Sequence, residues 1–467
     1  MDDFMMERFY TSELSLDDMR KLTLFNNETF ITAYDQVSVA GELKYRCPRY
    51  YFDTPVFAVD GRTEGESIEL SMRPEFKPLD ESQQNAIDAI VNNEHGMVCA
   101  RVGFGKTYVA IDALTKIGKK ALIVVHNASN NGLMDQWIEC VKRYTGCEEV
   151  GIIRANKCET NKPICITTVQ TLCSKVKRGD TEFLKKMYEA NFGVVFYDEC
   201  HITVGAPEFS ESTKAIFAKR IYGLSATPFR SDGLSQLLEW HIGKEIYNDG
   251  VMFVLPMYVG LLDIPIDLGK SIKYIEYGSR QGLQARYANI LTKREAYVQA
   301  VASMADQCIE AGRHPLVLSS RIDMLYALKE LSKHKDKISV VHAEATDKNY
   351  QSPAIFATYG MFKVAMDVPH LDTLIFATPL TAKGGLIQAI GRVARKVPSK
   401  PNKTVMILDI NNSAYSVMDN MRRIRLGYYN SIKKQCTKPV TMIKLNKVDD
   451  VKELCSVIER RSVSDNA

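Results

Sequence analysis

The stretch that decides the fold is a short apolar strand running into a glycine-rich turn. The strand Met97-Val98-Cys99-Ala100 continues as Arg101-Val102-Gly103-Phe104-Gly105-Lys106-Thr107. Glycines let backbone N–H groups close around phosphate oxygens, and the N-terminus of a following helix adds partial positive charge. We expect Lys106 to reach the β- and γ-phosphates of a nucleotide and the Thr107 hydroxyl to ligate Mg²⁺. A glycine-rich turn ending in a surface lysine is the alternative, but it leaves the conjunction of strand, turn, Gly-Lys-Thr and helix unexplained.

A second stretch supplies carboxylates suited to hydrolysis. The apolar run 194–197 leads directly into Asp198-Glu199-Cys200-His201. Two adjacent carboxylates at the end of a strand can divide the work, so we expect Asp198 to hold Mg²⁺ and Glu199 to orient and deprotonate the attacking water. For this stretch taken alone, an acidic loop that caps a helix is the alternative.

Short apolar runs alternate with helical patterns around these two stretches. Runs at 121–125, 164–167 and 221–224 are separated by segments with apolar residues at three- and four-residue spacing. This alternation is typical of a parallel sheet covered by helices.

The alternation pauses at 243–250 and then resumes. We therefore predict an α/β protein with two parallel-sheet domains in tandem, residues 76–250 and residues 251–430. Residues 1–75 carry aromatic and β-branched runs broken by turn residues, which predicts a small N-terminal α/β or mostly β module. Residues 431–467 are expected to form a basic, weakly helical tail.

The composition is that of an ordinary globular protein. Of 467 residues, 45% are hydrophobic and 25% charged, and the formal net charge is +4. A nucleic-acid binder with this charge has to gather its basic residues on one face. The eleven cysteines include no Cys-x-x-Cys pair, which favours free thiols in a reducing cytosol over zinc ligands or disulfides. The acidic N-terminus argues against a signal peptide, and no run approaches the roughly 20 apolar residues of a membrane span. We expect a cytoplasmic protein without a membrane partner.

Taken together, these motifs resemble those of the superfamily 2 helicases of the DEAH- or DECH-box type, over about 76–430. The resemblance implies two tandem RecA-like domains with ATP and Mg²⁺ as cofactors, and nucleotide contacts along the whole turn from Ala100 to Thr107. Gln83, which is followed by Gln84, resembles the glutamine that reads adenine. The residues that resemble first-domain contacts to the nucleic-acid backbone are Gln136, Thr168 and Gln170.

The segment 224–230 resembles the Ser-Ala-Thr motif, which couples hydrolysis to domain movement in this superfamily. Small hydroxyls can switch hydrogen bonds between the acidic strand and a partner domain. The resemblance implies a nucleic-acid contact for Arg230. The residues with an expected coupling role are His201, Ser225, Ala226 and Thr227.

Two segments of the second domain extend the resemblance. Ser319 and Arg321 lie in a segment similar to the strand motif that opens this domain. Thr358 begins a segment that ends at Asp367, with Ala365 in place of the usual glycine. The resemblance implies nucleic-acid contacts for Ser319, Arg321 and Thr358, and a nucleotide contact for Asp367.

The run 388–395 resembles the arginine-finger motif. Arg392 and Arg395 are three residues apart, a spacing that places them on one face of a helix. Facing the nucleotide held by the first domain, they would stabilise the charge on the transferring phosphoryl group. The resemblance also implies a contact of Gln388 with Glu199 or His201. Two exposed arginines on a helix are the alternative for this pair taken alone.

The resemblance implies an ATP-dependent DNA helicase or translocase, a hydrolase that couples ATP turnover to unwinding or branch migration in recombination, repair or replication. The run 223–233 is similar to phage recombination helicases of the UvsW type, which implies the host-cell cytoplasm as location. We expect single-stranded, forked or branched DNA as the partner and a monomer as the state. The alternatives are RNA unwinding with transcript release, and ATP-gated movement along duplex without strand separation.

Two stretches are candidates for contact with the DNA track, and a third is a candidate for separating its strands. The first lies in the N-terminal module and comprises Arg46, Arg49 and the Tyr50-Tyr51 pair, with core or interface packing as the alternative. The basic and aromatic stretch 422–434 is the second, with a solvated helix face as the alternative. The neighbourhood 253–266, with Pro256 and Gly260, is the candidate for a strand-separating element such as a protruding hairpin.

Overall fold

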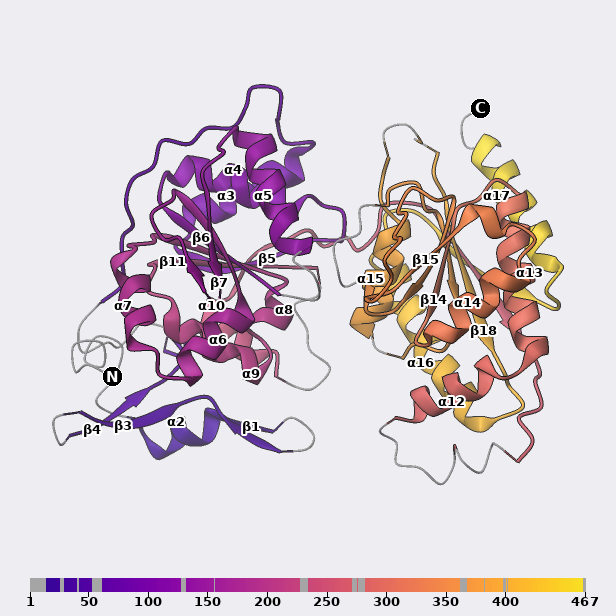
Figure 1. The fold of residues 1–467 in the computed structure, drawn as a ribbon, viewed down its shortest axis with the longest axis horizontal. Coiled ribbons are helices and arrows are strands. Elements are labelled where there is room, and N and C mark those ends of the chain that lie inside the picture. Colours follow the sequence, from indigo (N-terminus) through magenta and orange to yellow (C-terminus); the bar gives the residue numbers. More distant parts are fainter. Residues whose placement is uncertain are drawn as a thin grey trace. The chain divides into compact units, whose positions relative to one another are not determined.

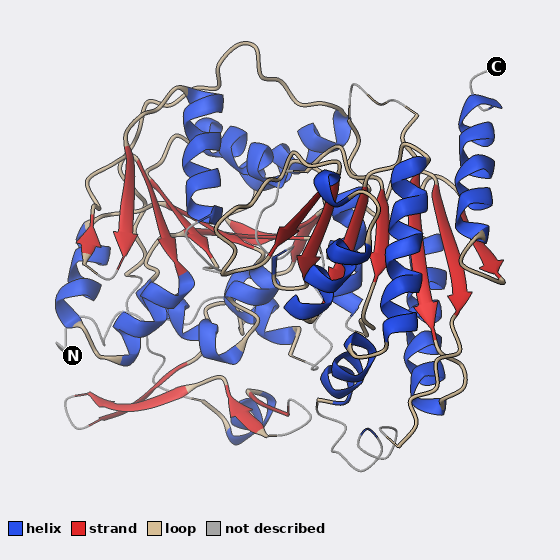
Figure 2. Ribbon diagram, turned by 45° about the vertical axis from the view of Figure 1, so that its right-hand side comes forward, coloured by secondary structure: helices blue, strands red, loops and turns tan. Residues whose placement is uncertain are grey.

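The chain divides into two compact units, Met1–Gly250 and Val251–Ala467. The computed structural model describes residues 14–25, 29–39, 42–52, 61–126, 132–154, 156–226, 234–270, 275, 282–361, 368–381, 383–397, 400 and 402–464. Each unit is built around its own β-sheet, with helices packed on the sheet (Figures 1 and 2). None of the described helices is long and apolar enough to cross a membrane.

Unit 1 contains an eight-stranded sheet in the order β12-β5-β11-β10-β6-β9-β7-β8. All neighbouring pairs are parallel except the edge pair β7–β8. This confirms the parallel sheet predicted from the alternating pattern. Along the chain the strands are β5 (His95–Cys99), β6 (Ala121–Val125), β7 (Val150–Arg154), β8 (Lys157–Cys158), β9 (Ile164–Thr168), β10 (Val194–Asp198), β11 (Arg220–Ser225) and β12 (Glu245–Asn248).

Helices cover both faces of this sheet, so its strands are apolar on both sides. Successive side chains of β5 point to opposite faces: Val98 packs in the core beneath α3, α4 and α5, whereas Met97 and Cys99 pack in the core beneath α6, α7 and α10. The helical segments are α3 (Glu81–Asn92), α4 (Lys106–Ile117), α5 (Gly132–Thr145), α6 (Val169–Lys177), α7 (Thr181–Glu189), α8 (Cys200–Thr203), α9 (Pro207–Ser210), η1 (Glu211–Ala215) and α10 (Gln236–Ile242).

In its described residues the N-terminal module contains a short helix and two antiparallel hairpins, which agrees with the predicted small α/β module. It packs on α10 of unit 1, where Tyr51 meets Trp240 edge-on at 5.5 Å between ring centroids. The Arg49 guanidinium donates to the carbonyl oxygens of Ala218 and Ile216, and Tyr50 stacks on His95 at 3.8 Å. These contacts favour the interface alternative for this stretch. The module's elements are α2 (Leu16–Lys21), β1 (Thr23–Phe25), β2 (Phe30–Thr32), β3 (Asp35–Val39) and β4 (Glu42–Arg46).

Unit 2 contains a seven-stranded sheet in the order β15-β16-β14-β17-β18-β13-β19, and all neighbouring pairs are parallel. Along the chain the strands are β13 (Met257–Asp263), β14 (Pro315–Ser319), β15 (Ile338–Val341), β16 (Ala354–Thr358), β17 (Thr373–Phe376), β18 (Val405–Asn411) and β19 (Val440–Leu445). The helical segments are α12 (Leu283–Thr292), α13 (Glu295–Glu310), α14 (Ile322–Leu331), η2 (Lys335–Lys337), α15 (Lys383–Val393), α16 (Ser416–Lys433) and α17 (Asp450–Ser464).

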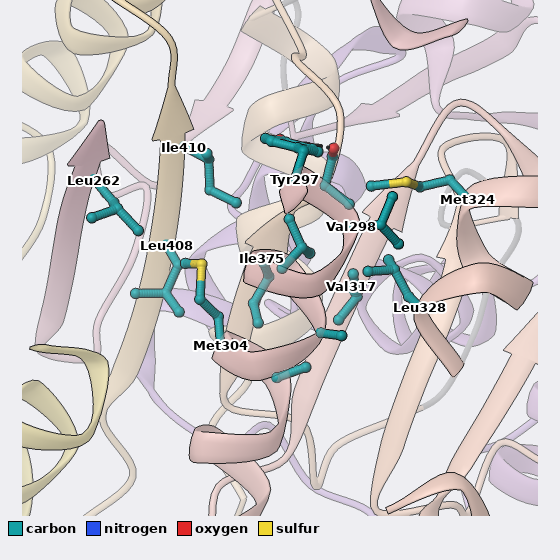
Figure 3. Close-up of a cluster of buried hydrophobic side chains, with 14 of the residues drawn as sticks. Leu262, Tyr297, Val298, Met304, Val317, Met324, Leu328, Ile375, Leu408 and Ile410 are labelled. Carbon is teal, nitrogen blue, oxygen red and sulfur yellow. Dashed lines mark hydrogen bonds between the residues drawn. The ribbon is translucent and has the colours of Figure 1, made fainter. Parts of the chain in front are cut away.

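One face of the second sheet is covered by α13, α14 and α17. Figure 3 shows part of the resulting core, where Tyr297 and Val298 of α13 lie with Val317 of β14 among the buried side chains. These residues are close-packed and apolar, so the core supplies most of the favourable free energy of folding.

Two expectations for unit 2 are wrong. The segment after residue 430 is not a tail, because β19 pairs with β13 along its length and α17 buries Val451, Leu454 and Ile458 against α13. The stretch 253–266 does not form a protruding hairpin. Its residues 257–263 are the inner strand β13, which is paired on both sides by β18 and β19.

The basic stretch of α16 is partly structural. Arg425 lies at the centre of unit 2, where its guanidinium donates two hydrogen bonds of 2.8 and 2.7 Å to Asp409 of β18. The Tyr429 hydroxyl donates to the same carboxylate at 2.8 Å. The side chains of Arg425 and Asp409 are 2% and 0% exposed. Arg425 and Tyr429 are therefore unavailable to nucleic acid.

Replacing Arg425 with Met should strongly destabilise unit 2, because Asp409 would stay buried without its charge partner. Removal of one partner of a buried ion pair costs about 3–5 kcal/mol of unfolding free energy. Arg423→Met is the matched control on the same helix, since Arg423 is 70% exposed in its pair with Asp419 and such a pair contributes about 0–1 kcal/mol. Urea unfolding measures both, and equal losses would contradict the assignment.

Candidate active site

The glycine-rich turn occupies the C-terminal end of β5 and leads into α4. Gly103 and Gly105 have φ angles of +79° and +88°, a region that side chains other than glycine rarely adopt. A Cβ on Gly105 would also lie 2.7 Å from the Gln83 amide nitrogen. The turn thus brings its backbone to the N-terminus of α4, a ready-made site for phosphate.

Lys106 is the first residue of α4, and its ammonium group points back into the turn. Lys106 Nζ donates to the carbonyl oxygens of Ala100 at 3.2 Å and Arg101 at 3.4 Å. Phosphate oxygens are stronger acceptors for an ammonium group than neutral carbonyls. The turn and Lys106 therefore fit a nucleotide phosphate. Thr107 follows in the first turn of α4 and is half-buried.

Of the two candidate glutamines, Gln83 is the one that contacts the turn. Its side chain is 3% exposed; the amide nitrogen donates to Phe104 O at 2.6 Å and the amide oxygen accepts from Leu79 N at 2.8 Å. Gln84 instead donates to Asp88 along the outer side of α3. Of the two adjacent glutamines, Gln83 is therefore the one that lies at the glycine-rich turn.

The acidic pair ends β10, two strands away from the turn in the sheet. Asp198 is the last residue of the strand, and Trp137 of α5 donates its indole N–H to Asp198 Oδ2 at 2.9 Å. Glu199 has a left-handed backbone with φ +46°, a strained conformation for a non-glycine residue that is found mostly at functional sites. Thr203 donates to the carbonyl oxygen of Asp198 at 3.0 Å and fixes the turn.

The electrostatics of this pair suit a bound cation. Burial raises the pKa of the Asp198 carboxyl to about 6, and the neighbouring negative charge of Glu199 adds to the rise. Among the described residues no hydrogen-bond donor pairs with Glu199 Oε2, which is buried and lies 3.3 Å from His201 Nδ1. A divalent cation would relieve the repulsion between the two carboxylates. Asp198 is therefore a suitable residue to hold Mg²⁺.

His201 connects the acidic pair to the neighbouring strand. Its Nδ1 lies 2.9 Å from the hydroxyl of Ser225, the last residue of β11. The same strand hydrogen-bonds the nucleotide turn, since Ala100 N donates to Ser225 O at 3.0 Å. The structure thus joins the turn, Ser225 and His201 in one network, with Ala226 next along the chain. Thr227 and Arg230 lie outside the described residues.

The remaining first-unit candidates lie near the same edge. Thr168 ends β9 and caps α6, accepting from Thr171 N at 3.2 Å, and its side chain is buried. Gln170 lies in the first turn of α6 and Gln136 precedes Trp137 on α5; both are half-buried.

In unit 2, Ser319 and Thr358 are neighbours at the ends of the adjacent strands β14 and β16. Ser319 is fully buried, and its hydroxyl accepts from Arg321 N at 3.0 Å. The Arg321 guanidinium donates to Ala285 O at 3.0 Å. Ser319 thus shapes the turn that carries Arg321. Asp367 lies outside the described residues.

The arginine pair is not on one helical face as predicted, because α15 ends between its members. Arg392 is in the last turn of α15, which ends at Val393, and Arg395 lies beyond the helix. Val397 already forms an antiparallel bridge with Lys400, so the chain has turned away from the helix. Gln388 lies one turn before Arg392.

Two contacts in unit 1 were not predicted. The hydrogen bond from Trp137 to Asp198 spans 61 positions of sequence, and the ion pair between Arg101 and Asp249 spans 148. The sequence gives a weak signal for Trp137, because it follows the candidate Gln136. It gives no signal for Asp249.

Comparisons with known proteins bear on this site. Residues 76–230 match the family model described as "Type III restriction enzyme, res subunit". The chain is 25% identical over 358 residues to a putative ATP-dependent RNA helicase L396 of Acanthamoeba polyphaga mimivirus, covering 73% of this chain and 66% of that protein. It is 24% identical over 347 residues to the probable helicase D10 of Escherichia phage T5, with 72% of each chain covered. It is 22% identical over 317 residues to the ATP-dependent DNA helicase uvsW of Enterobacteria phage T4, covering 62% and 59%.

Among solved structures, S. cerevisiae Dbp5 bound to RNA and ADP BeF3 is similar with a TM-score of 0.53 and 13% identity, covering 81% of this chain and 93% of that one. This likeness confirms the fold of two tandem RecA-like domains. The sequence similarities confirm the resemblance to superfamily 2 helicases and the predicted enzyme class, an ATP-dependent helicase.

Replacing Trp137 with Phe should shift the acid limb of the pH profile for kcat/KM to higher pH. The indole hydrogen bond lowers the pKa of Asp198, so its loss leaves the carboxyl protonated over a wider range and unable to hold Mg²⁺. Turnover with Mg-ATP should therefore fall more at pH 6 than at pH 8, because kcat/KM reports on groups of the free enzyme.

The control is Trp240→Phe, the other of the two tryptophans, which packs on the N-terminal module. It should leave the profile in place. An unchanged profile in Trp137→Phe, or a uniform loss of activity at every pH, would remove Trp137 from the tuning of Asp198.

Proposed function

We propose that the protein is an ATP-driven motor with DNA as its track, which unwinds or branch-migrates forked and branched DNA. The observation that carries this proposal is the network at one edge of the first sheet. It joins the nucleotide turn, the Asp198-Glu199 pair and the Ser225 hydroxyl through hydrogen-bonded strands and His201. Such a network links what happens at the phosphates to the end of the neighbouring strand β11.

In the proposed reaction each side chain has one task. Lys106 leaves the turn carbonyls to bind the β- and γ-phosphates, while Thr107 and Asp198 hold Mg²⁺, which when bound withdraws charge from the phosphate oxygens. Glu199, fixed by its left-handed backbone, orients the attacking water and takes its proton. We propose that Arg392 and Arg395 of the second domain stabilise the charge on the transferring phosphoryl group, with Gln388 beside them.

Coupling is assigned to His201 and Ser225. When Glu199 gains a proton, the charge beside His201 Nδ1 changes, and the 2.9 Å contact to Ser225 gains or loses strength with it. We propose that this contact passes the hydrolysis state to the end of β11, and that Gln136, Gln170, Arg321 and Thr358 line the nucleic-acid track.

Support for DNA over RNA comes from the printed name of the T4 relative, an ATP-dependent DNA helicase. RNA is the second candidate, because the mimivirus relative is named a putative RNA helicase. Movement along duplex without strand separation is the third, because the matching family model describes a restriction subunit. We further propose that the protein is a monomer. We also propose that it acts in the host-cell cytoplasm, which the phage source of two relatives supports.

One panel of substrates tests the proposal. ATP turnover and strand displacement are measured with single-stranded DNA, blunt duplex, forks, four-way junctions and RNA duplex. Forks and four-way junctions should stimulate turnover most and should be separated into strands. Stimulation by RNA alone would overturn the DNA assignment, and stimulation by duplex without displacement would favour the translocase.

The same panel tests the arginine assignment. Arg392→Ala should lower DNA-stimulated turnover about 10³-fold, the usual contribution of an arginine finger. Arg460→Ala is the control, because Arg460 is exposed on α17 and lies outside the stretch 422–434. Equal activities of the two variants would remove Arg392 from the reaction.

A further inference from the structure

A buried ion pair ties the nucleotide turn to the last residues of unit 1. The Arg101 guanidinium, second in the turn, hydrogen-bonds the Asp249 carboxylate. The two side chains are only 16% and 4% exposed. Water therefore cannot readily replace either partner. If one of the two side chains moves, the other has to move with it, because otherwise a buried charge would be left unpaired.

Asp249 marks the point where the chain leaves unit 1. Its backbone N–H donates to Cys99 O at 3.0 Å, immediately before the nucleotide turn, and the preceding strand β12 pairs with β5 through an irregular register. The next residue, Gly250, ends unit 1; its φ is +67° and no atom lies within 4 Å of where a Cβ would be. A restrained residue is thus followed at once by a glycine, whose backbone conformation other residues rarely adopt.

Arg101 also contacts Lys106, the lysine expected to bind the nucleotide. The Arg101 carbonyl oxygen accepts from Lys106 Nζ at 3.4 Å, a contact that has to break when Lys106 turns to phosphate. The Arg101 guanidinium lies 5.1 Å from the centre of the Phe104 ring, and that ring lies 5.9 Å from Tyr247 of β12. A second, aromatic route therefore runs from the turn to the same strand.

We infer that Asp249 is a positioning residue that transmits the occupancy of the nucleotide turn to the segment entering unit 2. When Lys106 binds phosphate, the Arg101 backbone loses a donor and settles into a new position. The buried ion pair carries this shift to Asp249, and Gly250 converts it into rotation of the following chain. The inference deepens the proposed function and rests on it, because the coupling it describes is that of the motor.

The test compares Asp249→Asn, the conservative Asp249→Glu, and an insertion of two glycines after Gly250. Asp180→Asn is the matched control, because it also removes a carboxylate from a unit 1 ion pair, with Lys175. Three quantities are measured: the Kd of a fluorescent ADP analogue with Mg²⁺, ATP turnover with and without DNA, and hydrogen exchange at residues 249–256 with and without Mg-ADP.

Asp249→Asn should leave the ADP-analogue Kd and DNA-free turnover near wild type, and lower DNA-stimulated kcat at least about 5-fold. Mg-ADP should change hydrogen exchange at residues 249–256 in wild type but not in this variant. Asp249→Glu should restore both responses. The glycine insertion should reproduce the loss of stimulation, and adding Asp249→Asn to it should cause no further loss, because both act on one path.

The inference is overturned if Asp249→Asn keeps both the stimulation and the exchange response. It is equally overturned if the Kd rises as much as kcat falls, because the ion pair would then only build the nucleotide turn. Absence of DNA stimulation in wild type would instead refute the proposed function, while the exchange comparison with Mg-ADP would still decide the role of Asp249.

Discussion

Hydrogen bonding between the parallel strands β5, β11 and β10 sets Cys99 opposite Ser225 and Leu224 opposite Asp198. In a parallel sheet the carboxyl ends of the strands share one edge, where ligands bind. The register therefore places the nucleotide turn, the Ser225 hydroxyl and the acidic pair side by side, and no contact between distant loops is needed to bring them together. A slip of one residue in either pairing would turn Asp198 to the other face of the sheet.

The parts of this site that the sequence reveals are those encoded in consecutive residues. The turn ending in Gly105-Lys106-Thr107 and the strand ending in Asp198-Glu199 each carry their own signal, so turn, strand and sheet type were predictable. Contacts between distant positions carry none: Trp137 with Asp198, Arg101 with Asp249, and Arg425 with Asp409 depend on tertiary packing. The final strand β19 was missed for the same reason: four of its six residues are apolar, but the strand is recognisable only from its pairing with the distant β13.

Buried charges have different surroundings in the core of unit 2 and in the candidate active site. The Arg425–Asp409 pair is fully enclosed, and the Tyr429 hydroxyl donates a further hydrogen bond to Asp409, which suits a fixed core. Among the residues that the structure describes, Glu199 Oε2 instead accepts no hydrogen bond, and the pKa of Asp198 is raised, which suits a site that exchanges ligands. The N-terminal module packs on the rest of unit 1 through Arg49 and Tyr51. Any surface that this module exposes therefore moves together with the nucleotide turn.

Single-turnover hydrolysis by a Glu199→Gln variant tests the central claim most directly. The variant keeps the shape of Glu199 but cannot take a proton from water. Mixed with ATP and Mg²⁺, it should bind nucleotide with an affinity near wild type and hold it unhydrolysed, with or without forked DNA. Glu208→Gln, at an exposed position on α9, should hydrolyse ATP as wild type does. Hydrolysis by Glu199→Gln at the wild-type rate would contradict the account.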